Sequence, residues 1–179
     1  MYNSIKKDKN DRATVDLVLD PRTLIIIHKL IKNDKIENIY GCVSTGKEAN
    51  VYLAEGRCTD FNENIRIPEE DPNLDLAIKI FKTSILVFKD RERYVNGEFR
   101  FRKGHCKGNP RKKVKLWAEK EVRNLKRICM SGKIHAPKPL YLKNNVIVME
   151  FIGEKGVAAP RLKDAMLNMD KSVRDTIAA

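Results

Sequence analysis

Short apolar runs separated by polar turns dominate the chain, and they predict five β-strands. The runs are rich in Val, Ile, Leu and Tyr and span about five residues each, which is typical of half-buried or buried strands. Asn144-Asn145 reads as a tight turn between the last two runs. The predicted strands cover residues 37–43, 50–54, 76–82, 139–142 and 146–151.

One longer segment has the spacing of an amphipathic helix. Apolar side chains recur three and four positions apart along residues 114–128, as on one face of a helix. Glu121 lies at the edge of that apolar stripe, where a carboxylate can point inward and stay near solvent. Glu119 lies elsewhere on the helix, and we expect it to pair with Arg123, four residues later.

Two further helices are predicted outside this region. Helical spacing of apolar residues indicates a helix over residues 23–31, for which Asp20-Pro21 is a typical start. A second apolar stripe runs through residues 161–179. The first helix should pack on the sheet; the second should pack back on it, pair with another copy, or lie against a further lobe.

Together these elements predict an α+β fold, with a five-stranded antiparallel sheet and one crossing helix. A chain of 179 residues with 42% hydrophobic content can bury one core. We expect residues 1–34 to form an N-terminal segment with its packing helix and residues 35–153 to form the main domain. Residues 154–179 would lead out of this domain and form the last predicted helix. Within the main domain, residues 55–73 read as a polar loop and residues 82–113 as a basic excursion.

The turn between the first two strands has the composition of a phosphate-binding loop. It reads Ser-Thr-Gly-Lys-Glu-Ala-Asn-Val-Tyr over residues 44–52, and its small side chains let the backbone approach a phosphate closely. The candidate nucleotide-binding residues of this turn are Ser44, Thr45, Gly46, Lys47, Ala49 and Val51.

A P-loop is an alternative interpretation, because residues 41–47 have its spacing of two glycines and a lysine. Two features argue against it. Glu48 occupies the place of the required Ser or Thr, and strand formers follow where a P-loop needs a helix. A strand-turn-strand unit is favoured, but only Gly46 of the three kinase glycines is present, so the turn alone fits a plain hairpin equally well.

A lysine and a glutamate far apart in the sequence complete the predicted site. Lys79 ends the apolar run Leu-Ala-Ile-Lys, as does the lysine that binds the nucleotide phosphates in protein kinases. That lysine is held by a carboxylate from the helix packed across the sheet, and Glu121 is the candidate here. The alternative, that Glu121 is one more solvated helix residue, becomes less favoured once the turn and Lys79 are considered together.

The last predicted strand leads into a segment typical of a kinase hinge. In that interpretation Met149 is the gatekeeper, while the Glu150 carbonyl and the Ile152 amide pair with adenine. A core strand that simply ends at Gly153 is the alternative, and only the position of the segment after the helix favours the hinge.

Longer blocks of the sequence resemble the RIO family of atypical serine kinases, over about residues 8–165. An N-terminal block at residues 11–23 is similar to its first branch, the Rio-one type. The other blocks are residues 44–52, 80–90 (Ile-Phe-Lys-Thr-Ser-Ile-Leu-Val-Phe-Lys-Asp), 97–102, 108–112, 117–121 and 149–153 (Met-Glu-Phe-Ile-Gly).

The resemblance implies a serine/threonine-protein kinase that uses ATP and Mg²⁺ and acts in maturation of the pre-40S ribosomal particle. It implies a cytoplasmic protein, with the nucleus as a second compartment. No histidine here fits the catalytic H-x-D pattern and no D-F-G occurs, so the catalytic and metal-binding aspartates are missing. We therefore expect an N-lobe that is inactive alone, with no metal ligands of its own and with the Mg²⁺ ligands in a C-lobe beyond residue 179.

Positive charge is concentrated in one segment. The net charge is +12, and residues 82–115 hold 12 Lys or Arg against 3 acids, interleaved with aromatic residues. Such a composition suits contact with ribosomal RNA, or with an acidic assembly factor, on the pre-40S particle. A solvated basic loop is the alternative. We expect one short helix in it, near residues 85–94.

The remaining composition narrows the class of protein. The chain has no long apolar run and no signal-peptide pattern, so we expect no membrane association and an intracellular location. Its four scattered cysteines predict free thiols. A zinc site from His105, Cys106, Cys129 and His135 is disfavoured by their spacing.

Three functions remain open at this point. The first is an ATP-dependent serine kinase, represented by its N-lobe. The second is an ATPase switch on the pre-ribosome that uses the same pocket. The third is a basic module that binds RNA or protein without nucleotide chemistry.

Overall fold

The computed structural model describes residues 19–56, 74–83, 109–160 and 164. Several predicted features lie outside these residues. They are the N-terminal block before residue 19, most of the loop at 55–73, the short helix near 85–94 with most of the basic excursion, and the helix over 161–179.

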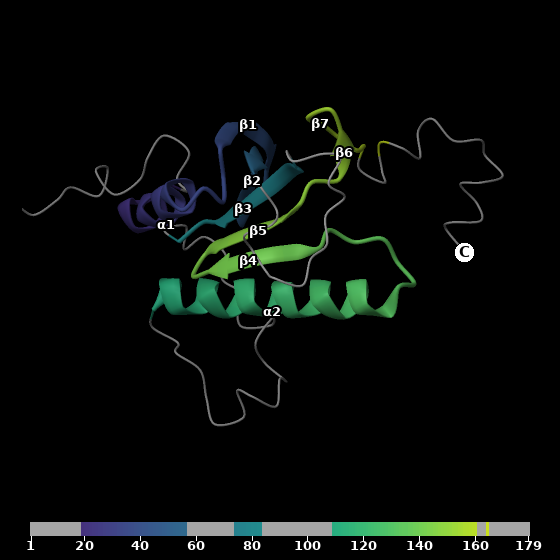
Figure 1. Cartoon of the computed structure of the whole chain (residues 1–179). Helices are drawn as coiled ribbons and strands as arrows, with labels where there is room; N and C mark the ends of the chain where they lie inside the picture. Colours follow the sequence, from purple (N-terminus) through teal and green to yellow (C-terminus); the bar gives the residue numbers. More distant parts are fainter. Residues whose placement is uncertain (1–18, 57–73, 84–108, 161–163, 165–179) are drawn as a thin grey trace, which may run out of the picture.

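The predicted five-stranded antiparallel sheet is confirmed (Figure 1). Its strand order is β1-β2-β3-β5-β4, so β3 is central. The register places Lys79 of β3 opposite Val51 of β2 and Ile147 of β5. The strands are β1 (Asn38–Thr45), β2 (Ala49–Gly56), β3 (Leu74–Phe81), β4 (Pro139–Lys143) and β5 (Val146–Glu150).

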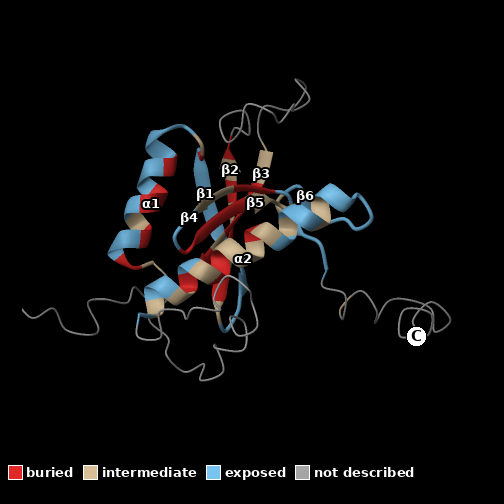
Figure 2. Ribbon diagram, turned by 90° about the horizontal axis from the view of Figure 1, so that it is seen from below, coloured by how far each residue is buried: buried red, intermediate tan, exposed pale blue. Residues whose placement is uncertain are grey.

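The two faces of the sheet are covered by different helices. On one face, α1 (Pro21–Lys32) buries Ile26, Ile27 and Leu30 in a core with the even-numbered residues of β3. On the other face, α2 (Pro110–Ser131) packs Val114, Trp117, Ala118 and Val122 against Phe81 and Ile147. In Figure 2, the buried residues of α1 lie on its side toward the strands, and α2 crosses in front of the sheet. Since side chains alternate along a strand, the odd-numbered residues of β3, including Lys79, point toward α2.

Helix α2 starts earlier than the helix predicted over residues 114–128. Asn109 caps α2 by accepting hydrogen bonds from the Arg111 and Lys112 amides at 3.0 and 3.3 Å, and Pro110 follows it. Both residues favour a helix start. Arg111, Lys112 and Lys113 therefore belong to the first turns of α2 and not to a loop.

Three other details differ from the expectations. Glu119 pairs with Lys115 at 3.8 Å rather than with Arg123, because both lie four residues away and only the packing chooses between them. Strand β2 continues to Gly56 through its pairing with β3. After β5, a two-stranded hairpin forms from β6 (Gly153–Glu154) and β7 (Val157–Ala158), too short to leave a periodic signal.

Asp20 joins three elements at one end of the sheet. Its carboxylate caps α1 by accepting from the Thr23 amide at 2.8 Å, and it accepts from the Thr83 hydroxyl at 2.8 Å. The Arg111 guanidinium of α2 lies 2.9 Å away. Burial raises the pKa of Asp20, but the hydrogen bonds from Thr23 and Thr83 and the charge of Arg111 outweigh it, so the pKa lies below its ordinary value.

Gly56→Ala tests the close packing at the end of β2. A Cβ there would overlap the Lys35 carbonyl oxygen and lie 2.9 Å from Leu76. We expect a loss of about 3 kcal/mol in the free energy of unfolding, measured by urea denaturation. Gly41→Ala is the control, since a Cβ at Gly41 meets nothing within 4 Å. Equal stability of the two variants would contradict this packing.

Asp20→Asn tests the junction through its pH dependence. The amide keeps a capping oxygen but loses the charge facing Arg111, and we expect a loss of about 1 kcal/mol at pH 7. A lowered pKa contributes stability above the unfolded value of 3.8, and this contribution is lost as the pH falls through the folded value. The difference from the native chain should thus stay constant above about pH 5 and shrink below about pH 4. A difference that grows in acid would refute the assignment.

Candidate functional site

Lys79 and Glu121 form the centre of the candidate site. The Lys79 ammonium donates to both carboxylate oxygens of Glu121, at 2.7 and 2.8 Å. The two side chains are 24% and 31% exposed, so the pair is partly buried yet reachable from solvent. The Phe81 ring, two residues along the same face of β3, lies 5.1 Å from the ammonium. The structure therefore brings together the two residues that the sequence predicts as a catalytic pair.

A cavity of about 410 Å³ lies beside this pair, under the turn between β1 and β2. Lys79 and Phe81 line it from β3. The turn contributes the predicted residues Ser44, Gly46, Lys47, Ala49 and Val51, together with Glu48. Thr45, also predicted, does not line the cavity and instead pairs with Asn50 in the sheet.

The turn is closed by a hydrogen bond of its own. The Gly46 amide donates to the Ala49 carbonyl at 2.9 Å, and a Cβ on Gly46 would lie 3.0 Å from that oxygen. Strand β2 begins at Ala49, immediately after the turn. The absence of a helix at this point rules out the P-loop, which needs one.

A second hollow of about 280 Å³ adjoins the ion pair along α2. It shares Glu48, Phe81 and Glu121 with the site just described, and it continues along the helix past Trp117 to Leu125 and Ile128. Glu48 and Phe81 were not among the predicted site residues. Phe81 lies two residues after Lys79 on β3, and this spacing is the signal that could have placed both side chains on the same face of the sheet.

The three hinge candidates lie at or just after the end of β5, and none of them lines the cavity under the turn. Met149 stands opposite Ala77, two residues from Lys79 along β3, and packs partly buried against the core under α2. Glu150 exchanges hydrogen bonds with Lys138: its amide donates to the Lys138 carbonyl, and its carboxylate accepts from the Lys138 amide, each at 3.0 Å. Ile152 is half exposed, and its carbonyl accepts from the Ala159 amide.

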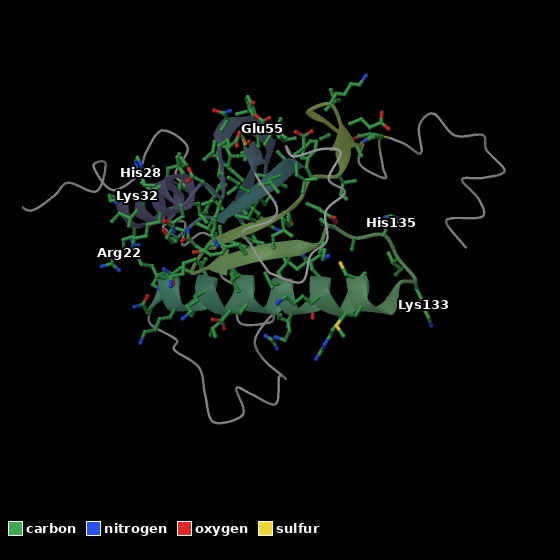
Figure 3. The ribbon with its side chains drawn as sticks, in the orientation of Figure 1. Arg22, His28, Lys32, Glu55, Lys133 and His135 are labelled. Atoms are coloured by element: carbon green, nitrogen blue, oxygen red, sulfur yellow. The ribbon has the colours of Figure 1, made fainter. Side chains whose placement is uncertain are left out.

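Metal-ligating side chains are scattered in the part of the chain that the structure describes. Within residues 19–56, 74–83 and 109–160, no group of three or more His, Cys, Asp or Glu is placed to hold a metal ion. Cys129 directs its thiol to the Ala136 carbonyl at 3.6 Å. His28 and His135 lie exposed at the surface (Figure 3). No helix in this described part is long and apolar enough to cross a membrane.

The arrangement is that of the N-terminal lobe of a protein kinase. Its diagnostic features are a glycine turn between two antiparallel strands and a third-strand lysine paired with a glutamate of the crossing helix. The family model described as the RIO domain matches residues 50–179. The chain belongs to this family.

Curated relatives agree with the family assignment. The chain is 56% identical over 164 residues to the serine/threonine-protein kinase rio1 of Dictyostelium discoideum, covering 92% of the chain and 26% of that protein. It is 55% identical over 166 residues to RIO1 of Saccharomyces cerevisiae (88% and 34%). It is 54% identical over 166 residues to RIO1 of Homo sapiens (93% and 27%). The chain thus spans about a quarter to a third of the length of these relatives.

Proposed function

We propose that this chain is the ATP-binding lobe of a serine/threonine-protein kinase that acts in maturation of the small ribosomal subunit. The proposed ATP binding rests on one observation, the Lys79–Glu121 pair beside a cavity lined by the glycine turn. The relatives at 54–56% identity bear the name of serine/threonine-protein kinase, which supports phosphoryl transfer over a purely structural use of the lobe.

The residues around the cavity fit a triphosphate. Two ammonium groups, Lys47 and Lys79, border it together with the backbone of the turn. In our assignment Lys79 binds the α and β phosphates, Glu121 orients Lys79, and residues 44–49 cover the phosphates. ATP, bound with Mg²⁺, would supply the phosphoryl group that is transferred.

The adenine would be held further along the same face of the sheet. Val51, Ala77 and Met149 share this face with Lys79, because they pair across the sheet in register with it or two residues away. Met149 would act as the gatekeeper. The Glu150 carbonyl and the Ile152 amide would pair with the base, and the half-exposed position of Ile152 leaves its backbone accessible.

A contact with RNA is proposed for the end of the lobe where α1 and α2 begin. A hollow of about 250 Å³ there is lined by Arg22, Arg111, Lys112 and Lys115, with Thr83 and three asparagines. Clustered cations around a hollow suit a phosphate backbone. Arg111 already faces the buried carboxylate of Asp20 at 2.9 Å, whereas Lys115 makes only a longer, exposed pair with Glu119 at 3.8 Å. Arg22, Lys112 and Lys115 are therefore the better candidates for the contact. We place this contact on the pre-40S particle, in the cytoplasm with the nucleus as a second compartment.

Lys79→Ala in the complete kinase tests the nucleotide site. Autophosphorylation should fall on the order of 100-fold or more, because the group that positions and neutralises the phosphates is removed. Glu121→Gln should cause a smaller loss by releasing Lys79. Lys126→Ala, an exposed lysine on α2, is the charge-matched control and should leave the rate unchanged. Activity retained in Lys79→Ala would rule out this function for the pair.

The RNA contact is tested by binding to pre-ribosomal RNA at several salt concentrations. Replacing Arg22, Lys112 and Lys115 together by Gln should weaken binding about tenfold at 150 mM salt and reduce the salt slope by about two. A control triple, Lys126→Gln with Arg127→Gln and Lys133→Gln, removes the same charge at exposed positions near the other end of α2. If both triple variants weaken binding equally, the loss comes from the reduced net charge, and the assignment of the RNA contact to this hollow is wrong.

A further inference from the structure

Lys82, the residue after β3, makes two contacts with the phosphate turn. Its backbone amide donates to the Glu48 carbonyl at 2.8 Å. Its side-chain ammonium donates to the Gly46 carbonyl at 2.7 Å. One residue thus holds two of the carbonyl groups in the turn, although it lies 36 positions from Gly46 in the sequence.

The contact with Gly46 determines the orientation of the next amide. A trans peptide unit is planar, with its C=O and N–H pointing in opposite directions. When the Gly46 carbonyl is turned toward Lys82, the N–H of Lys47 in the same peptide unit points away from Lys82. The Gly46 amide is already used by Ala49, so it is not available to an anion while the turn is closed.

Lys82 itself does not line the phosphate cavity, whereas Gly46, Lys47 and Lys79 do. Its ammonium contacts the turn at the Gly46 carbonyl. This distinguishes it from Lys79, whose ammonium borders the cavity and is paired with Glu121. Lys82 can therefore affect a bound phosphate through the backbone of the turn.

The two lysines lie three residues apart at the end of β3. Lys79 lies in β3 and Lys82 directly follows it, while Phe81 between them is fixed in the core and its amide donates to Asn145 at 2.9 Å. The separation between the two lysine backbones is consequently set by a rigid element, and each ammonium is held by its own partner, Glu121 for Lys79 and the Gly46 carbonyl for Lys82. Holding the turn from β3 fixes the position of its backbone relative to Lys79.

We propose that Lys82 is a positioning residue for phosphate binding, which holds the Gly46 carbonyl outward so that the Lys47 amide faces the triphosphate. This rests on the proposed nucleotide function of the cavity. The preformed turn then needs little rearrangement when ATP binds, and its backbone donor acts together with the ammonium groups of Lys47 and Lys79.

The first test measures amide hydrogen exchange at Gly46 by NMR, in the full chain without nucleotide. Lys82→Met should speed this exchange about fivefold, since the turn loses one of its constraints. Lys82→Arg keeps a donor for the Gly46 carbonyl and should restore slow exchange. Lys126→Met removes the same charge elsewhere and should have no effect, and neither should Lys79→Met. Unchanged exchange in Lys82→Met would overturn the proposal.

The second test measures kinetics in the complete kinase. Lys82→Met should raise the KM for ATP about fivefold with kcat changed less than about twofold, because binding geometry is lost while Lys79 and Glu121 remain. Lys82→Arg should recover most of the KM. Faster exchange without a change in KM would show a contact that does not serve phosphate binding, and would also overturn the proposal.

The two hypotheses fail separately. If Lys79→Ala stays active, the nucleotide site is misassigned, whatever Lys82 does to the turn. If Lys79→Ala is inactive but Lys82→Met has a normal KM, the nucleotide site stands and only the role of Lys82 is lost.

Discussion

The fold depends on a charged residue placed on the central strand of a sheet that is covered on both faces. Lys79 has β2 and β5 on either side, and α2 packs against the face to which its side chain points, so its ammonium cannot be fully hydrated. A partly buried cation needs a partner, and Glu121 supplies both carboxylate oxygens. This requirement links the helix to the sheet in one orientation. The same orientation leaves the ammonium at the edge of a cavity, which is why structure and candidate chemistry cannot be separated here.

Around this pair, rigid strands hold the parts that a phosphate would meet. The turn at residues 46–49 has one internal hydrogen bond, from the Gly46 amide to the Ala49 carbonyl, and two further hydrogen bonds join it to Lys82. Strand β3 therefore supplies a cation inside the cavity and a support behind the turn. A site built in this way can be nearly formed before its ligand arrives, which lowers the entropic cost of binding.

At one end of the lobe, structural and binding roles divide among neighbouring basic residues. Asp20 holds Arg111 and Thr83 and caps α1, so it joins both helices to the end of β3. Arg22 and Lys112 line the adjacent hollow without taking part in this junction. Positive charge alone does not distinguish these residues, because the difference lies in the buried carboxylate that only some of them reach.

The sequence alone determined the five strands, the two helices and the pairing of Lys79 with Glu121. The order of apolar and polar residues reflects which positions are buried, and the likeness of the Lys79 strand to that of protein kinases implied Glu121 as its carboxylate partner. The start of α2 was predicted too late, although Asn109-Pro110 carries a capping signal, because the surrounding basic residues suggested a loop. Tertiary structure alone decided that Glu119 pairs with Lys115, that Thr45 lies outside the cavity, and that Lys82 holds Gly46. The contacts of Thr45 and Lys82 depend on the distance between separate elements, which no spacing along the chain encodes, whereas the Glu119–Lys115 pair is a choice between two equally spaced partners on one helix.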